Sequence, residues 1–257
     1  MAEVLLSAQK VTKRFGGLAA VNGVSVDLWR GKIHAVIGPN GAGKSTLTNL
    51  LSGDLPPTSG QVLLGGTNVT GWAPERISRQ GLGRSYQKTN IFLPLTVHEN
   101  VRLAAQSRDA QQPWNPLRWW QDTRSDTIKN RATSARLESA IGLSGLKDRC
   151  TAIAGAMSHG EQRQLEIAMT LATEPQVLLL DEPLAGMGVA EAERMVELLQ
   201  RLKPAHAMML VEHDMDAVFA LADRLTVMVN GEVIAHGTPP EVRADATVQA
   251  AYLGEDH

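Results

Sequence analysis

A glycine-rich stretch near the N-terminus has the composition of a loop that binds phosphate. The sequence GPNGAGKST runs from Gly38 to Thr46 and fits the spacing G-x-x-x-x-G-K-[ST]. Its glycines allow backbone N–H groups to approach phosphate oxygens, and a helix N-terminus favours negative charge. The apolar run Ile33–Ile37 before the loop predicts a buried strand, and the leucines after it have helical spacing. We therefore expect Lys44 to reach the β- and γ-phosphates of a nucleotide and Ser45 to bind Mg²⁺.

Acidic residues follow a second predicted buried strand. Asp181 and Glu182 come directly after Val177–Leu180, and ligands bind at the carboxyl ends of parallel strands. We expect Asp181 to join the metal shell and Glu182 to orient or deprotonate an attacking water. His213 ends another apolar run, so we expect it at the same edge, in contact with the γ-phosphate. An exposed acidic turn before Pro183 and a histidine without a catalytic role are the alternatives.

The segment AMSHGEQRQLE predicts an unusual helix start. Ser158 and Glu161 have the spacing of a capping box, but this box does not account for His159 and Gly160. Glycine costs about 1 kcal/mol relative to alanine inside a helix, so Gly160 has another purpose. We interpret the helix start as a second anion site. Because the chain has one nucleotide motif, the second site could serve the nucleotide of another chain.

Composition limits the class of protein. The chain has 257 residues, 43% hydrophobic residues and a formal net charge of −2, which favours a globular fold and gives no basic field for nucleic acid. Its single cysteine, Cys150, cannot form an internal disulfide. No uncharged apolar run approaches the roughly 18 residues that a membrane helix requires. We expect a soluble, cytoplasmic protein without a nucleic-acid partner.

The order of predicted elements indicates an α/β fold with a largely parallel central sheet. Residues from about 88 to 155 are poor in β-branched residues and predict an inserted helical subdomain. Residues 1–87 and 156–257 would form the nucleotide-binding core with an antiparallel β subdomain, all within one domain spanning 1–257. Asn230–Gly231 predicts a type I′ hairpin turn, and Thr238–Pro239 predicts the start of a short helix.

Together these motifs resemble the ATP-binding-cassette (ABC) ATPases, in the right order and over nearly the whole chain. GPNGAGKST resembles the Walker A loop, MSHGEQ the family signature, LLLDEP the Walker B segment and His213 the switch histidine. Phe15 resembles the aromatic that stacks on adenine, and Gln87 the Q-loop glutamine. The resemblance implies that ATP and Mg²⁺ are bound. It implies catalytic roles for Glu182, His213 and Gln87, and metal ligands at Ser45, Gln87 and Asp181. Nucleotide contacts would come from Phe15, Gly38, Pro39, Asn40, Gly41, Ala42, Gly43, Lys44, Ser45 and Thr46, and from Ser158, His159, Gly160 and Glu161 toward the ATP of a partner cassette.

Two positions depart from the common pattern of the family. His159 stands where the signature usually has a glycine, and Gly188 stands where the loop after Walker B commonly has an aspartate. Both departures, together with the ending GTPPEVRADATVQAAYLGE, resemble cassettes of branched-chain amino-acid importers and their urea and amide relatives. Because Gly188 lacks a carboxylate, the resemblance does not imply the contacts that this aspartate makes across a cassette dimer.

The resemblance implies the ATP-hydrolysing subunit of an importer at the cytoplasmic face of the inner membrane. Its expected partners are a second cassette, two transmembrane permease subunits and an extracytoplasmic solute-binding protein. A lipid or lipopolysaccharide exporter, a non-transport cassette ATPase acting on nucleic acid or the ribosome, and a metabolite kinase are the alternatives. Three tryptophans, Trp114, Trp119 and Trp120, predict a permease contact, a membrane-surface contact or a locally packed helical segment.

Overall fold

The structure, a computed structural model, describes residues 3–86, 90–108 and 123–253. By their contacts the residues form two compact units. The first unit holds both sheets and comprises Met1–Gln87, Pro175–Ala185 and Leu199–His257; the second is helical and comprises Lys88–Glu174 and Gly186–Leu198. Sequence analysis placed all residues after 155 in the core. In the structure, residues 156–174 group with the helical unit because their helix packs against two other helices of that unit.

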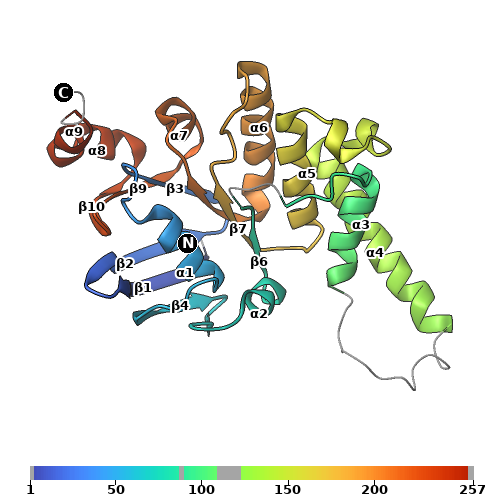
Figure 1. Cartoon of the computed structure of the whole chain (residues 1–257), viewed down its shortest axis with the longest axis horizontal. Helices are drawn as coiled ribbons and strands as arrows, with labels where there is room; N and C mark the ends of the chain where they lie inside the picture. The colour runs from blue at the N-terminus through green and yellow to red at the C-terminus, as the bar shows by residue number, and fades with distance from the viewer. Residues whose placement is uncertain (1–2, 87–89, 109–122, 254–257) are drawn as a thin grey trace. The chain divides into compact units, whose positions relative to one another are not determined.

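A six-stranded sheet is the centre of the first unit (Figure 1). Its neighbours β9, β3, β8, β7 and β6 are parallel, and β10 pairs antiparallel with β9 at the edge. Two of these strands, β7 and β8, are buried along their whole length and apolar except for Asp181, as expected of parallel strands covered on both faces. In spatial order the strands are β10 (Glu232–Gly237), β9 (Arg224–Val229), β3 (Lys32–Ile37), β8 (Ala207–Val211), β7 (Val177–Asp181) and β6 (Leu82–Arg84).

The strand register aligns the carboxyl ends of three central strands. Val36 of β3 pairs with Val211 of β8, and Val211 pairs with Asp181 of β7. The residues that directly follow these strands therefore emerge side by side at one edge of the sheet. This is the edge at which an open parallel sheet binds its ligands.

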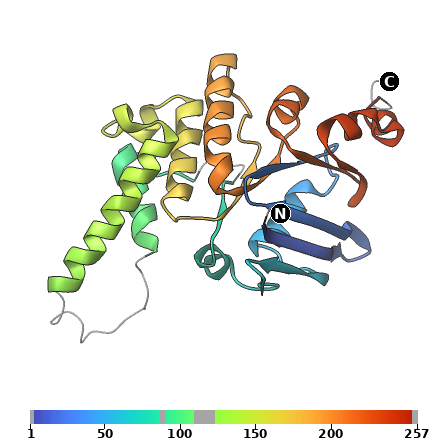
Figure 2. The ribbon, with the colours of Figure 1, turned by 180° about the vertical axis from the view of Figure 1, so that it is seen from behind.

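A four-stranded antiparallel sheet completes the first unit, and its two long strands are seen from behind in Figure 2. One apolar cluster joins residues of this sheet, of the six-stranded sheet and of α1 (Lys44–Ser52), including Leu47, Leu50 and Leu51. Helix α1 is thereby anchored through its buried leucines, which leaves its N-terminus to carry the glycine-rich loop. In spatial order the strands are β2 (Leu18–Trp29), β1 (Val4–Phe15), β4 (Ser59–Leu64) and β5 (Thr67–Asn68).

The second unit packs three helices against one another (Figures 1 and 2). They are α3 (Val97–Ser107), α4 (Thr123–Ser144) and α5 (His159–Leu171), with the short 3-10 helices η2 (Lys147–Arg149) and η3 (Ala154–Ala156) between the last two. The predicted helical region is confirmed, and so is the predicted capping box at Ser158. The Glu161 N–H donates to Ser158 Oγ over 3.3 Å, and the Ser158 N–H donates to Glu161 Oε2 over 3.0 Å.

The remaining helices are short except for α6 (Val189–Leu202), which runs from the second unit into the first. The short helices are α2 (Pro74–Arg79), η4 (Lys203–Ala205), α7 (Met215–Leu221), α8 (Pro239–Ala244) and α9 (Ala246–Leu253). Asn230 and Gly231 both have positive φ, as the predicted type I′ turn requires, and Thr238 caps α8 as predicted. Within the residues described, no helix is both long and apolar enough to cross a membrane.

Candidate nucleotide-binding site

The glycine-rich loop connects β3 to α1, in the strand–loop–helix context that the sequence predicts. Gly43 caps α1 with a φ of 100°, and no side chain among the described residues caps this helix start. A Cβ at Gly43 would lie 2.3 Å from the carbonyl oxygen of Ala20, and one at Gly38 would lie 2.1 Å from that of Met228. Only glycine fits these two positions, so the loop keeps its shape and leaves helix N–H groups for an anion.

Lys44 is the first residue of α1, and its ammonium folds onto the loop. Its Nζ donates to the carbonyl of Gly38 over 2.5 Å and to that of Pro39 over 2.9 Å. Burial lowers the pKa of Lys44, while the negative charges of Glu182 and Asp181 act in the opposite direction. The structure thus brings the lysine and the two acidic residues into one electrostatic environment, where an ammonium can bridge loop and phosphate.

Asp181 and Glu182 lie where β7 ends, as predicted. Asp181 is buried, and its backbone N–H faces Ser85 Oγ at 3.4 Å. Glu182 has a φ of 48°, in the left-handed region that residues other than glycine rarely adopt. Its N–H donates to the carbonyl of Val211 over 2.9 Å, which fixes this conformation. Residues with strained backbone dihedrals cluster at functional sites, where the unusual backbone conformation fixes the direction of the side chain.

His213 lies beside Glu182 at the same sheet edge, as predicted from the parallel strands. Its Nδ1 is 3.9 Å from Glu182 Oε1, and its side chain is 67% exposed.

The residue before His213, Glu212, is buried and was not singled out by sequence analysis. Glu212 accepts the Leu184 N–H over 2.9 Å and the His213 N–H over 3.3 Å, and burial raises its pKa. One carboxylate therefore joins the loop after β7 to the backbone of the histidine.

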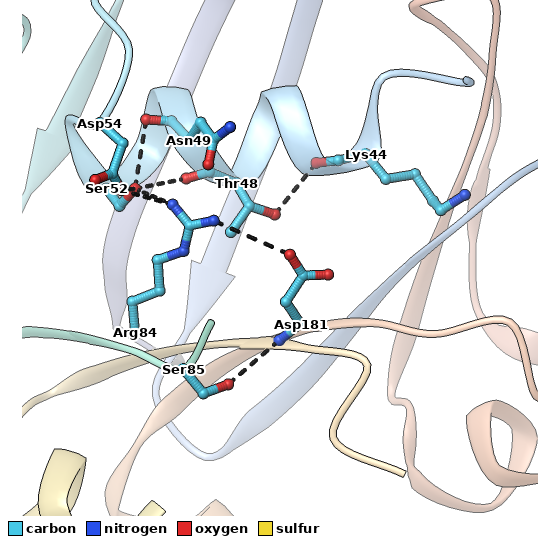
Figure 3. Close-up of polar contacts among 8 residues, drawn as sticks. All are labelled: Lys44, Thr48, Asn49, Ser52, Asp54, Arg84, Ser85 and Asp181. Atoms are coloured by element: carbon cyan, nitrogen blue, oxygen red, sulfur yellow. Dashed lines mark hydrogen bonds and ion pairs between the residues drawn. The ribbon is translucent and has the colours of Figure 1, made fainter. Parts of the chain in front are cut away.

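A second set of polar contacts that sequence analysis missed surrounds Arg84, between the end of α1 and Asp181 (Figure 3). Its Nη1 donates to Ser52 Oγ over 2.7 Å and to Asp54 Oδ2 over 2.6 Å. Its Nη2 lies 4.0 Å from Asp181 Oδ2, and the Tyr86 ring packs against the guanidinium with 4.6 Å between Cζ and the ring centroid. The arginine thus connects the helix of the phosphate loop to the acidic residue at the end of β7.

The residues predicted to form a second anion site lie at the N-terminus of α5, in the helical unit. Here Ser158 Oγ donates to Glu191 Oε1 over 2.7 Å. The ring of His159 is close to the backbone of Gly186, since a Cβ on that glycine would lie 3.4 Å from the ring. A pocket of ≈ 430 Å³ opens at this helix start, and its lining includes Gly160, Arg149 and Arg194. The helix N-terminus and the Ser158 hydroxyl suit this pocket to an anion, whereas its two arginines share the lining with Glu161 and Glu191.

Some predicted site residues are not brought together by described contacts. Phe15 lies at the end of β1, 50% exposed, with Lys13 Nζ 5.3 Å from its ring centroid. Gln87 and the three tryptophans at 114, 119 and 120 fall outside the described residues. In the part of the chain that the structure describes, no cluster of three or more His, Cys, Asp or Glu side chains could hold a metal ion. A metal here would therefore also require hydroxyl or phosphate oxygens.

Comparisons with known proteins agree with this geometry. The family model described as "ABC transporter" matches residues 21–185, and the one described as "Branched-chain amino acid ATP-binding cassette transporter" matches residues 232–257. The chain is 37% identical to the high-affinity branched-chain amino acid transport ATP-binding protein LivG of Escherichia coli (strain K12), over 99% of this chain and 100% of LivG. It is 35% identical to the corresponding protein BraF of Pseudomonas aeruginosa, again over 99% and 100% of the two chains.

A solved structure extends the likeness to the fold. The ADP conformation of an ATP-binding cassette of an ABC transporter superposes with a TM-score of 0.81 at 27% identity, covering 98% of this chain and 100% of that one. The predicted fold class is that of this family. The chain therefore belongs to the ABC transporter family, as a subunit that binds and hydrolyses ATP to drive transport, within the LivG/BraF group of branched-chain amino acid transport ATP-binding proteins.

Proposed function

We propose that this chain powers the import of branched-chain amino acids or closely related small solutes. The observation that supports the proposal most directly is the alignment of β3, β8 and β7, which brings Lys44, Glu182 and His213 to one sheet edge. The substrate class rests on the relatives, whose names give branched-chain amino acid transport. A cassette of this kind does not touch the solute, so its own residues determine only how ATP is used.

Hydrolysis would proceed by in-line attack of water on the γ-phosphorus, with cleavage of its bond to the β–γ bridging oxygen. Loop N–H groups and Lys44 bind the phosphates and neutralise their charge. Glu182 orients the water and accepts its proton, while His213 contacts the γ-phosphate. The products are ADP and inorganic phosphate. Catalysis here consists mainly of positioning and charge stabilisation.

The residues at the phosphate loop also fit Mg²⁺. Ser45 would supply a hydroxyl oxygen and Asp181 a carboxylate oxygen, which are hard ligands of the type that Mg²⁺ prefers, and the nucleotide would supply phosphate oxygens. Gln87 is the third ligand that we propose from the chain. The ion would neutralise charge on the β- and γ-phosphate oxygens.

The partners that we propose complete a transporter at the cytoplasmic face of the membrane. A second cassette would pair head to tail, with Ser158, His159, Gly160 and Glu161 of each chain facing the ATP of the other. Two permease subunits would carry the solute, and an extracytoplasmic protein would deliver it. The pocket at the N-terminus of α5 supports this pairing, because it offers anion donors in the helical unit, whereas the chain's own phosphate loop belongs to the other unit.

Uptake in cells that lack the gene tests the proposed substrate. Restoring the wild-type gene should restore uptake of radiolabelled leucine, isoleucine or valine, whereas Lys44→Ala should not. Lys147→Ala is the matched control, because Lys147 is exposed and lies on η2. If loss of the gene leaves branched-chain uptake unchanged but alters the uptake of another solute or the export of lipid, the substrate assignment is wrong.

Isolation of the tagged chain from its native membranes in mild detergent tests the proposed partners. We expect two permeases and a second cassette to accompany it. Recovery with ribosomes or DNA, and without a membrane protein, would contradict the transport complex.

A further inference from the structure

The N-terminus of α5 already holds an anion that belongs to the same chain. Glu191 lies in the first turn of α6, and its Oε1 accepts the Ser158 hydroxyl over 2.7 Å. A Cβ on Gly160 would lie 2.8 Å from Glu191 Cδ and 2.9 Å from Oε1. The absence of a side chain at Gly160 therefore lets the carboxylate lie directly over the first turn of α5.

The charge on this carboxylate is stabilised where it lies. The Ser158 hydroxyl contributes most to lowering the pKa of Glu191, and the N–H groups of Gly188 and Gly160 and the charge of Arg194 add to it. Glu191 is thus anionic at neutral pH. Two of its donors, the Ser158 hydroxyl and the Gly160 N–H in the first turn of α5, are groups of the kind that bind a phosphate.

A hydroxyl has one proton to donate. If Ser158 donates to Glu191, it cannot also donate to a phosphate, and two anions at the same donors repel each other. We infer that Glu191 is a further residue of the composite ATP site, whose carboxylate competes with the γ-phosphate of the partner cassette for Ser158 and Gly160. This inference rests on the head-to-tail pairing proposed above.

Arg194 gives the displaced carboxylate an alternative partner. It lies three residues after Glu191 on α6, a spacing at which helical side chains are neighbours, and it lines the same pocket. Arg149 also lines the pocket but is already paired with Glu161, with 2.9 Å between Nε and Oε1. Pairing of two cassettes therefore requires Glu191 to move from the start of α5 toward Arg194. The exchange sets how much ATP is needed for pairing.

The test measures pairing of purified full-length chains as a function of ATP concentration. All chains carry Glu182→Gln to prevent turnover, and the readout is the mass of the assembly in analytical ultracentrifugation, with the co-isolated second cassette present if there is one. Glu191→Gln removes the charge and Glu191→Ala also removes the acceptor. Glu193→Gln is the control, because Glu193 is exposed and two residues away.

We expect Glu191→Gln and Glu191→Ala to lower the half-saturating ATP concentration for pairing roughly tenfold, about the strength of one charge-assisted hydrogen bond. ADP binding to single chains, which does not involve α5, should stay unchanged and shows that the variants are folded. The proposed competition is wrong if both Glu191 variants pair at an unchanged or higher half-saturating ATP concentration, while Glu193→Gln pairs at the same concentration as its parent. Normal ATP binding without pairing in any chain overturns the proposed head-to-tail function, and this inference with it.

Discussion

The guanidinium of Arg84 lies 4.0 Å from the carboxylate of Asp181, and both side chains are almost completely buried. Through Ser52 and Asp54 the same guanidinium is fixed to the end of α1 (Figure 3). A buried acidic residue next to a phosphate site must keep one orientation to bind a cation. We therefore propose that Arg84 positions Asp181, the metal ligand proposed above, relative to the helix that starts at the phosphate loop.

Replacement of Arg84 should separate positioning from nucleotide affinity. We expect Arg84→Met to lower the free energy of unfolding by about 2 kcal/mol, because it leaves buried polar partners without a cation. It should also lower kcat by roughly tenfold while nucleotide affinity stays near normal, since the phosphate loop is untouched. Urea unfolding and steady-state ATPase assays measure the two effects.

Arg84→Lys and Arg201→Met are the comparisons for this prediction. A lysine can pair with one of the two carboxylates, Asp54 or Asp181, but not with both, so Arg84→Lys should recover part of kcat. The exposed Arg201 should be dispensable. A loss of ATP affinity as large as the loss of kcat in Arg84→Met would contradict a positioning role.

Glu182 provides a second prediction. Glu182→Gln keeps the shape of the side chain and an oxygen toward the water but cannot accept a proton, so turnover should fall at least ~100-fold. Equilibrium binding of ATP should be retained, because the loop and Lys44 are unchanged. ATPase rates and titration with a fluorescent ATP analogue measure the two quantities, with the exposed Glu197→Gln as control. Normal turnover in Glu182→Gln would rule out this residue as the base.

Local sequence patterns predicted much of this site. The strand before Gly38, the type I′ turn at Asn230–Gly231 and the capping box at Ser158 each depend on residues within a few positions of one another. The sheet edge was also predictable, because parallel strands place their carboxyl ends together.

Contacts between residues far apart in the sequence could not be predicted from local patterns. Arg84 and Asp181 are far apart in the sequence, as are Ser158 and Glu191, and no periodicity indicates that either pair meets. Glu212 was overlooked for another reason. It directly follows a buried strand and precedes the histidine that carries the motif, and a glutamate there has no sequence signature until its two N–H donors are seen.

Glu212 provides a third prediction. Glu212→Ala leaves the N–H groups of Leu184 and His213 without their acceptor, so the free energy of unfolding should fall by about 1–3 kcal/mol. Turnover should fall as well, because the loop after β7 and the backbone of His213 lose their common anchor. Glu212→Gln, which still offers one oxygen, should show smaller losses of both stability and turnover. Equal losses in the two variants would contradict the role of Glu212 as an acceptor for both N–H groups.

His34 predicts how stability depends on pH. It is buried in β3, and its Nε2 lies 2.8 Å from Thr226 Oγ1. Burial, with smaller contributions from the charges of His236 and Arg224, lowers its pKa from 6.5 to about 3. The folded chain thus keeps His34 neutral, while the unfolded chain protonates it below pH 6.5. Its stabilising effect is complete above pH 6.5 and is lost as the pH falls toward 3.

Urea unfolding at several pH values measures this dependence. Between pH 6.5 and pH 3, protonation of His34 in the unfolded chain should lower the free energy of unfolding by about 1.4 kcal/mol for each unit by which the pH falls. His34→Gln should lower stability near neutral pH but flatten the acid slope, because glutamine does not titrate. His236 has a lowered pKa too, so a shallower slope of the same sign should remain. The exposed His98→Gln should retain the full slope, and an equally steep slope in His34→Gln would show that His34 is not the group responsible.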